Sequence, residues 1–519
     1  MLNTQAMLLA DFYKISHRKL YDRKEGTIYA TWTPRKSRLA GVEEVVVFGI
    51  QGFIQKYLID YFNENFFKKP VADIVKEYQR IIKNTLGEDK ADTEHIYKLH
   101  SLGYLPIKID ALEEGTLCPI KCPCLTIQNT NSQFLWVTNF IETLFSMEVW
   151  KPMTSATIAK EYRKILDKWA NKTCDNNLHV DYQGHDFSMR GMGGLDSAMT
   201  SGAGHLTSFK GTDTIPAICY LEKYYNANVE KEVVGTSIPA TEHSIMEFNS
   251  YGTENDEYEA FKRIITDVYP SGFVSIVSDT WNLWHVLTDT VPRLKDEILC
   301  REGKVVIRPD SGDPCDIICG INTKTFFDPY RGAERPERLI TEKDSEYYEP
   351  INKGVVEILW DIFGGSINSK GYKVLDPHIG CIYGDAITLD RADEICQRLE
   401  AKGFASSNIV FGIGSYTYNM NSRDTFGFAL KSTYAVKDEE EIFLYKKPIT
   451  DNGEKTSQKG MVVVIEENGK IEYYDGFGYY PKYLCRKNDL LKPLFCDGKL
   501  LRETSLKDIR NKLNEVQND

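Results

Sequence analysis

Two glycine-rich turns in the second half of the sequence are candidates for binding phosphate. One follows the apolar run IGCIY and contains Gly384 and Asp385, and the other follows NIVFGI and contains Gly414 and Ser415. Backbone N–H groups at such turns, together with the dipole of a following helix, bind an anion without any net positive charge. The glycines could also serve only to permit tight turns, but two successive turns of this kind favour the phosphate interpretation.

A second group of residues could bind a flat ring with a polar substituent. In the segment GHDFSMRGMGG, Phe187 could stack on the ring while Arg190 reaches the substituent. A core phenylalanine and a surface ion pair are the alternative interpretation. Asp213 stands in a turn before the helix-compatible segment TIPAICYLEKYY, and the pattern alone favours a helix N-cap for it.

Three further residues could take part in acid–base or phosphate chemistry. His243 follows an acidic residue in SIPATEHS and is a candidate acid–base or phospho-acceptor residue, although most histidines are structural. Arg423 and Lys431 are eight residues apart, which on a helix would place them on one face, suited to gripping a diphosphate. A solvated charged face is the usual explanation for such a pair.

Four apolar runs predict the elements that position these residues. The runs are 274–280, 304–312, 379–387 and 408–416. Each ends in a polar or glycine-rich turn and is followed by helix-compatible sequence, which predicts a parallel sheet with both faces covered. Asp279, Asp310, Asp385 and Ser415 fall at the carboxyl ends of the predicted strands, where β/α barrels bind their ligands.

The rest of the chain is predicted to form an α+β region around this barrel. The fold class we expect is α/β, an irregular β/α barrel packed on an α+β domain built from both termini, with two helices in residues 131–170. The expected domains are a composite of 1–42, 150–183 and 416–519, a subdomain of 43–149, and a barrel of 184–415 with an inserted segment at about 320–352.

Composition restricts the class of partner and compartment. The formal charge of −12 argues against a nucleic-acid partner, because binding phosphate backbones needs a basic surface. No apolar window approaches the roughly 20 residues that span a bilayer, so we expect no membrane association. The 12 cysteines show no disulfide rhythm, as expected in the cytoplasm. CPIKCPC (118–124) has metal-like spacing but no second half, and its prolines and alternation predict a strand edge.

Common catalytic motifs are absent from the sequence. There is no GxSxG nucleophile elbow, P-loop, HExxH motif or dinucleotide fingerprint. Residue patterns therefore indicate a barrel enzyme for a phosphorylated substrate, and they do not identify the reaction.

Taken together, the segments resemble the nicotinamide phosphoribosyltransferases, which are type II phosphoribosyltransferases. The resemblance runs in collinear order along nearly the whole chain, through LLADFYKISH, VFGIQGFIQKYL, WVTNFIETL, HDFSMRG, FKGTDT, SIPATEHS, VSDT, IRPDSG, FGIGS and SRD. Each piece alone is weak, but the ordered set is specific. It implies transfer of a phosphoribosyl group from phosphoribosyl pyrophosphate (PRPP) to nicotinamide in NAD salvage.

The resemblance also implies a homodimer with shared active sites. Phe187 and a partner's Tyr13 would stack on the two faces of nicotinamide, Arg190 and Asp213 would bind its carboxamide, and Arg308 would lie along the ring and ribose. The carboxylate of Asp213 would favour nicotinamide over nicotinic acid, because it would repel a second carboxylate.

The remaining implied roles concern the sugar, the phosphates and ATP. Asp310 and the Gly384–Asp385 turn would bind ribose hydroxyls, and Gly414 and Ser415 would bind the 5′-phosphate. Arg423 and Lys431 would bind pyrophosphate, with Arg35 and Lys446 nearby. His243 would be phosphorylated by ATP and oriented by Asp279. Mg²⁺ would assist, without any protein ligand being implied for it.

Three alternatives remain at this point. The first is a nicotinate phosphoribosyltransferase on the same fold, against which Asp213 argues. The second is a binding or signalling protein that keeps the barrel without catalysis. The third is an unrelated barrel lyase or isomerase, which would be expected to use a lysine or metal-binding carboxylates.

Overall fold

The computed structural model of the chain divides into two compact units. It describes residues 4–252, 257–321, 348–450, 453, 455–479, 482 and 487–515. The first unit comprises Met1–Thr157, Pro216–Glu232 and Asn421–Asp519, and the second comprises Ile158–Ile215 and Val233–Met420. Most of the predicted insertion at 320–352 falls in 322–347, outside the described residues.

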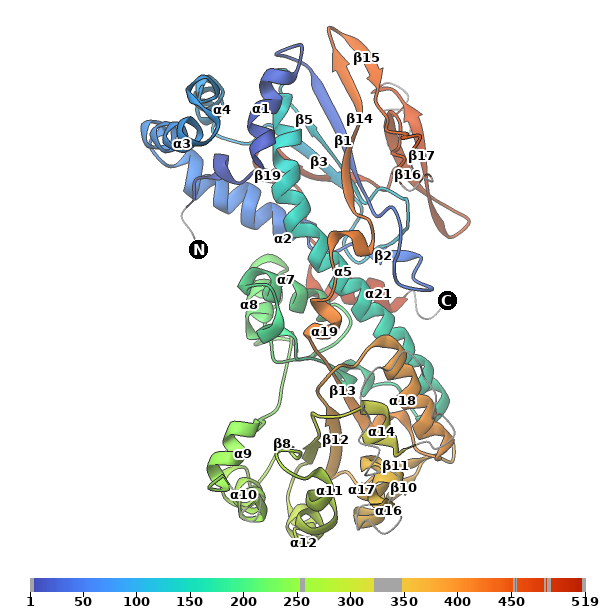
Figure 1. Cartoon of the computed structure of the whole chain (residues 1–519). Helices are drawn as coiled ribbons and strands as arrows, with labels where there is room; N and C mark the ends of the chain where they lie inside the picture. Colours follow the sequence, from blue (N-terminus) through green and yellow to red (C-terminus); the bar gives the residue numbers. More distant parts are fainter. Residues whose placement is uncertain are drawn as a thin grey trace. The chain divides into compact units, whose positions relative to one another are not determined.

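The first unit contains a seven-stranded sheet. Its order is β15 (Glu440–Phe443), β14 (Ala429–Lys437), β1 (Thr27–Thr33), β5 (Leu125–Asn129), β3 (Ile107–Ala111), β18 (Lys492–Cys496) and β19 (Lys499–Leu500). All its paired strands are antiparallel, and β1 lies beside β14 (Figure 1). The sequence of β1, TIYATWT, is rich in β-branched and aromatic residues, and nearly all of it is buried.

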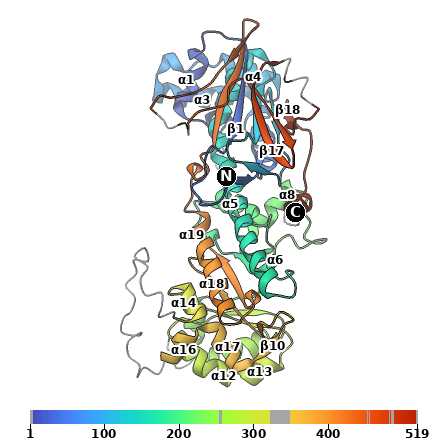
Figure 2. The same ribbon diagram turned by 90° about the vertical axis from the view of Figure 1, so that its right-hand side faces the viewer.

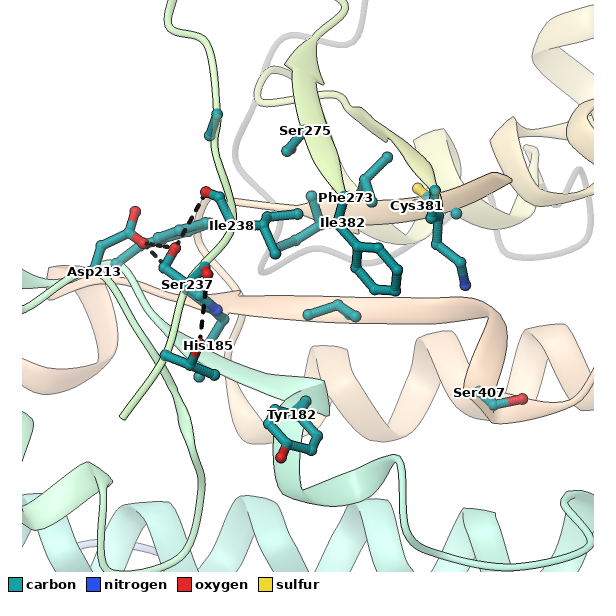
Figure 3. Close-up of a pocket in the computed structure, with 18 of the residues that line it drawn as sticks. Tyr182, His185, Asp213, Ser237, Ile238, Phe273, Ser275, Cys381, Ile382 and Ser407 are labelled. Carbon is teal, nitrogen blue, oxygen red and sulfur yellow. Dashed lines mark hydrogen bonds and ion pairs between the residues drawn. The ribbon is translucent and has the colours of Figure 1, made fainter. Parts of the chain in front are cut away.

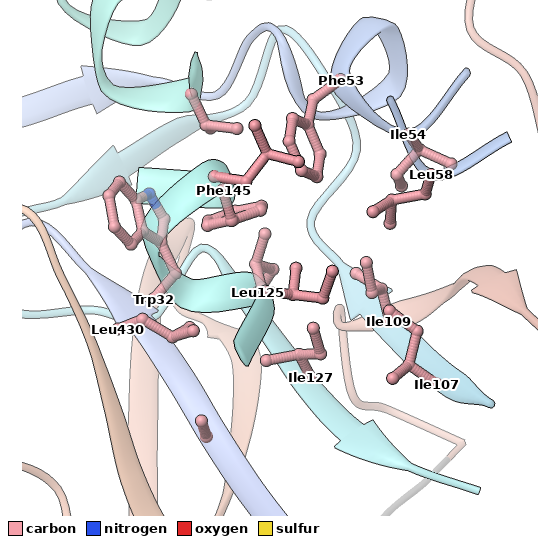
Figure 4. Packing of buried hydrophobic residues seen from close by; sticks show 14 of the residues in the cluster. Trp32, Phe53, Ile54, Leu58, Ile107, Ile109, Leu125, Ile127, Phe145 and Leu430 are labelled. Atoms are coloured by element: carbon pink, nitrogen blue, oxygen red, sulfur yellow. The ribbon is translucent and has the colours of Figure 1, made fainter. Parts of the chain in front are cut away.

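Aromatic and aliphatic side chains form the core of this unit (Figure 4). Trp32 of β1 is fully buried, stacks on Phe428 with ring centroids 5.3 Å apart, and meets Phe145 edge-on at 5.1 Å. Such offset and edge contacts add to the stabilisation that burial of the rings already provides.

Helices cover the core of the first unit. They include α1 (Phe12–Leu20), α2 (Ile50–Phe53), α3 (Val71–Leu86), α4 (Glu94–Leu102), α8 (Ile215–Tyr224) and α21 (Leu506–Glu515). The prediction of two helices in 131–170 is wrong, because α5 runs unbroken from Trp136 to Thr173 with Pro152 inside it. Gly49 leaves room for the proline ring, since a Cβ at Gly49 would lie 2.4 Å from Pro152 Cγ.

Two further antiparallel pairs of strands belong to the first unit. β2 (Glu44–Val46) pairs with β4 (Leu117–Pro119), and β16 (Met461–Glu467) pairs with β17 (Lys470–Phe477). Cys118 lies in β4, as the sequence pattern predicts.

The second unit is built on a parallel sheet of six strands. Their order is β7 (Gly211–Thr212), β6 (Gly184–Asp186), β13 (Ile409–Ile413), β12 (Ile379–Tyr383), β9 (Val305–Arg308) and β8 (Val274–Val277). Every neighbouring pair is parallel. The four strands predicted from apolar runs are confirmed as β8, β9, β12 and β13.

A short extended segment, residues 236–240, joins the two edges of this sheet. Thr236 forms a parallel bridge with Gly211 of β7, and Ala240 forms one with Ser275 of β8. We call this segment the seam. Two backbone hydrogen bonds link it to the β7 side, and bonds from Ser275 N to Pro239 O and from Thr241 N to Ser275 O link it to β8. The sheet is therefore closed into an irregular barrel, which confirms the predicted α/β barrel.

Helices surround the barrel strands. They include α7 (Leu195–His205), α9 (His243–Asn249), α10 (Glu257–Arg263), α14 (Pro314–Cys319), α17 (Val355–Phe363), α18 (Leu389–Ala401) and α19 (Ser415–Tyr418). Of these, α14 packs against both α17 and α18 (Figure 2). Nowhere in the described part of the chain is there a helix with the length and apolar character that a membrane span requires.

Candidate functional site

A cavity of about 400 Å³ occupies the interior of the barrel (Figure 3). One end is lined by Phe273 and Lys304, which directly precede β8 and β9. The other is lined by His185, Phe187 and Asp213 at the carboxyl ends of β6 and β7. This volume is within the range of small-molecule sites. Burial lowers the pKa of Lys304.

Two glycines make room for the ring of Phe187. A Cβ at Gly412 would lie 2.4 Å from Phe187 Cδ2, and one at Gly384 would lie 3.4 Å from Phe187 Cε2 and 2.7 Å from Asp310 Oδ1. Phe187 therefore packs over the backbone of two neighbouring strand ends. Gly384 has a steric reason to be glycine in addition to any part in binding phosphate.

Asp213 follows β7 and is held by two side chains. Its Oδ1 accepts hydrogen bonds from His185 Nε2 (2.9 Å) and Ser237 Oγ (2.6 Å). Burial alone would raise the pKa of Asp213, but the His185 and Ser237 hydrogen bonds and the positive charge of Arg308 outweigh it, so the pKa is lowered. The helix-cap interpretation of Asp213 is wrong, because its carboxylate bonds to these side chains instead of the start of α8.

Arg308, the last residue of β9, lies near two carboxylates. Its positive charge acts to lower the pKa of both Asp213 and Asp310. Its Nε is buried and makes no hydrogen bond to any residue that the structure describes. This N–H is therefore left without an acceptor among the described residues, and a role for Arg308 along a ring and ribose stays a prediction.

Three carboxylates gather at the ends of β8, β9 and β12. Burial raises the pKa of Asp310, and the negative charges of Asp279 and Asp385 add to the rise, while Arg308 and His243 oppose it. Asp279 Oδ2 accepts the backbone N–H of Asp310 at 2.9 Å. The predicted ribose-binding residues Asp310, Gly384 and Asp385 are thus brought together.

His243 begins α9 beside this group. Its Nδ1 lies 3.2 Å from Thr280 Oγ1 and its Nε2 lies 3.9 Å from Asp310 Oδ2, with 40% of the side chain exposed. Among the described residues no ion pair or hydrogen bond joins His243 to Asp279, and an orienting role for Asp279 stays a prediction. Asp279 uses Oδ2 for the backbone of Asp310, while its buried Oδ1 has no hydrogen-bond partner among the described residues, and Thr280 contacts the imidazole.

The second glycine-rich turn lies against the loop after β6. Gly414 directly precedes α19, whose first residue is Ser415. A Cβ at Gly191 would lie 2.1 Å from Ser415 Oγ, so the loop that carries Phe187 and Arg190 packs against this turn. Arg190 is exposed and is therefore accessible to a ligand.

In the first unit, the four predicted pyrophosphate-binding cations gather around Lys431. Burial lowers the pKa of Lys431, and the charges of Arg35, Arg423 and Lys446 lower it further, while Glu142 opposes them. Glu142 lies 3.9 Å from Lys431 Nζ. The prediction that Arg423 and Lys431 share a helix is wrong. Arg423 lies in a single 3-10 turn and Lys431 lies in strand β14.

Tyr13 of α1 lies in the same unit as these cations. Its side chain is 57% exposed, and it lines a cavity of about 220 Å³ together with Asp11, Glu142 and Arg423. An exposed tyrosine next to a cation is suited to binding a flat, charged ligand.

The described residues contain no ready-made metal centre. No group of three or more histidine, cysteine, aspartate or glutamate side chains is arranged to hold a metal ion in the part of the chain that the structure covers. This applies to Cys118, Cys122 and Cys124, whose thiols are buried and free. Mg²⁺ differs from zinc in that it is usually held by one or two carboxylates and by substrate phosphates.

Two residues at the Asp213 end of the cavity were not named as candidates by sequence reasoning. His185 precedes Phe187 by two positions, and the period of two along a strand could have indicated that both face the barrel interior. Ser237 gave no signal, because its partner Asp213 is 24 residues away in the sequence.

Comparisons with known proteins show the family of the chain. A model of the nicotinate phosphoribosyltransferase (NAPRTase) family matches residues 182–499. A nicotinamide phosphoribosyltransferase of Acinetobacter baylyi is 47% identical and aligns over 97% of this chain and 96% of its own. One of Mycoplasma pneumoniae is 33% identical over 86% of this chain and 92% of its own.

Two solved structures share the fold at 14% identity. A nicotinate-nucleotide pyrophosphorylase from Pyrococcus furiosus covers 99% of this chain and 95% of its own, with a TM-score of 0.55. Human nicotinic acid phosphoribosyltransferase covers 98% of this chain and 93% of its own, with a TM-score of 0.52. The predicted type II phosphoribosyltransferase fold is confirmed, and the chain belongs to the nicotinate phosphoribosyltransferase family.

Proposed function

We propose that this chain is an enzyme of NAD salvage that forms nicotinamide mononucleotide and pyrophosphate from nicotinamide and PRPP. The observation that carries the choice of acceptor is the Asp213 carboxylate, held in its anionic form beside Phe187. An anion accepts a hydrogen bond from a carboxamide NH₂ and repels the carboxylate of nicotinic acid. The names of the bacterial relatives support the same choice.

The proposed chemistry requires orientation and charge stabilisation. Pyrophosphate leaves the ribose, the ribose carbon becomes oxocarbenium-like, and the pyridine nitrogen attacks from the opposite face. No general base is needed, because that nitrogen carries no proton. Phe187 would orient the ring, and Asp310 and Asp385 would bind the ribose and stabilise its positive charge. Gly414 and Ser415 would bind the 5′-phosphate.

The enzyme that we propose is a homodimer in which a second copy completes each site. Tyr13 would cover the free face of nicotinamide, and the cluster around Lys431 would bind the leaving pyrophosphate. Cations that stabilise a leaving anion lower the barrier most where water is excluded. Co-expression of a Lys431→Met chain with an Asp213→Ala chain would give more activity than either homodimer, because one site of each heterodimer keeps both residues. Activity no higher than in either variant would contradict the shared site.

Two cofactor roles are part of the proposal. Asp310 and Asp385 would hold Mg²⁺ together with the phosphates of PRPP, and the ion would supply positive charge for the leaving group. ATP would phosphorylate His243, whose partly exposed imidazole supports this role. Replacing His243 with alanine would then abolish ATP stimulation and an acid-labile phosphate on the protein. We place these reactions in the cytoplasm, as the free cysteines support.

The decisive experiment measures product formation with both acceptors. The purified chain is incubated with PRPP and Mg²⁺ and either nicotinamide or nicotinate, with and without ATP, and each mononucleotide is quantified. We expect nicotinamide mononucleotide to dominate. A larger kcat/KM for nicotinate would favour the alternative that the family name suggests. Asp213→Ser should lower the nicotinamide preference about tenfold, since it removes the anion.

A further inference from the structure

The Asp213 carboxylate is engaged on one oxygen only. Both His185 Nε2 and Ser237 Oγ donate to Oδ1, at 2.9 and 2.6 Å (Figure 3). Oδ2 accepts no hydrogen bond from any residue that the structure describes, while 44% of the side chain is exposed. The two donors therefore leave the second oxygen available to a ligand in the cavity.

The chemistry of the two donors fixes both the charge and the direction of the carboxylate. A hydroxyl and an imidazole N–H can each donate to an anion, and the bond to His185 requires the proton on Nε2. Two hydrogen bonds to the charged form favour ionisation of Asp213, and the Arg308 guanidinium adds to this effect. The Asp213 backbone N–H, bonded to Asp186 O at 2.9 Å, holds the main chain in place.

We propose that His185 and Ser237 are positioning residues that set the preference for an amide over an acid acceptor. They hold Asp213 Oδ1, so that Oδ2 faces the carboxamide NH₂ of nicotinamide. This inference rests on the proposed function and deepens it. It assigns the selectivity to a group of three residues from β6, the turn after β7 and the seam, instead of to Asp213 alone.

A purely structural role is the alternative, especially for His185. Its side chain is nearly buried, and its ring centroid lies 4.7 Å from that of Phe187, so its loss could disturb packing. Ser237 is exposed and contributes a single hydroxyl, which makes it the cleaner position to test. A structural role would change stability and both acceptors alike, whereas a positioning role changes selectivity and pH dependence.

The test compares Ser237→Ala with its conservative control Ser237→Thr. Initial rates are measured at saturating PRPP with nicotinamide and with nicotinate. For Ser237→Ala we expect KM for nicotinamide to rise about threefold with kcat within about twofold, and nicotinate kcat/KM not to fall. Ser237→Thr keeps the hydroxyl and should behave like the wild type. His185→Leu should have a larger effect in the same direction.

The pH profile gives a second readout. The charged or titratable groups that face Asp213 are His185 on β6 and Arg308 on β9. Removing a donor raises the pKa of Asp213, so the acid limb of kcat/KM for nicotinamide should move to higher pH in Ser237→Ala and not in Ser237→Thr.

The outcomes separate this inference from the proposed function. A wild type that forms nicotinamide mononucleotide, with a Ser237→Ala variant whose acceptor ratio and acid limb are unchanged, overturns the positioning role and leaves the function standing. A wild type that does not use nicotinamide overturns both. If His185→Leu fails to fold, the Ser237 pair still decides the question.

Discussion

Replacing Gly412 with alanine should displace Phe187, the ring on which nicotinamide is proposed to stack. Gly412 lies in strand β13 with a backbone conformation open to any residue, so only the added methyl group matters. Its Cβ would lie 2.4 Å from Phe187 Cδ2 and 2.7 Å from Gly384 Cα. Ordinary contact begins at 3.4 Å, so the Phe187 ring must move by about 1 Å.

The size of the effect follows from this displacement. Inserting a methyl group into a packed core costs about 1–3 kcal/mol of stability. Misplacing an orienting group by ~1 Å can reduce catalysis by about 10²-fold. We therefore expect kcat/KM for nicotinamide to fall by about 10- to 100-fold. KM for PRPP should change less, although the added Cβ also meets Gly384 of the turn that would bind ribose.

The assay measures initial rates with nicotinamide and PRPP varied in turn, together with urea denaturation. Gly193→Ala is the matched control, because a Cβ at Gly193 would meet no atom within 4 Å. If folded Gly412→Ala retains kcat/KM for nicotinamide within twofold of the Gly193→Ala value, Phe187 is not the platform for the ring.

Three further predictions follow from other contacts. Gly191→Ala, whose Cβ would lie 2.1 Å from Ser415 Oγ, should raise KM for PRPP about tenfold in steady-state assays, with a smaller rise in KM for nicotinamide because Gly191 directly follows Arg190. Lys431→Met should weaken pyrophosphate binding about 10- to 100-fold by calorimetry. Because the pKa of Lys431 is lowered, pyrophosphate binding to the wild type should be lost as pH rises through that pKa. Lys431→Arg stays charged at high pH, so an equal loss of pyrophosphate binding in this variant would contradict the prediction. Burial raises the pKa of Glu114 from 4.5 to about 7. Because the unfolded chain loses this proton at lower pH than the folded chain, the free energy of unfolding should fall by roughly 1–3 kcal/mol between pH 4.5 and 7. Urea titrations of Glu114→Gln should lack this pH dependence.

The barrel could be predicted because its strands carry a strong local signal. The runs that became β9 and β12 are almost wholly apolar and end in polar turns, which is typical of parallel strands buried on both faces. The placement of Asp310 and Asp385 at one end of the barrel follows from the common direction of the strands.

Other features depend on contacts between distant residues and leave no local pattern. Pro152 suggests a break in the helix, and the packing of its ring against Gly49 joins residues far apart in the sequence. The bond between His185 and Asp213 joins residues 28 positions apart. The seam forms a single bridge on each side and has a proline within it, so its sequence resembles a loop.

The seam is the part of the barrel wall with the shortest backbone pairing, a single bridge on each side. Two backbone hydrogen bonds hold it on each side, and each contributes only about 1 kcal/mol net. Local opening there should therefore cost less than global unfolding, and the amides of Thr236 and Thr241 should exchange with deuterium sooner than those of β12. Ser237 belongs to the seam, so each local opening would briefly break its hydrogen bond to Asp213. The rate of opening of the seam is therefore linked to the selectivity between nicotinamide and nicotinate.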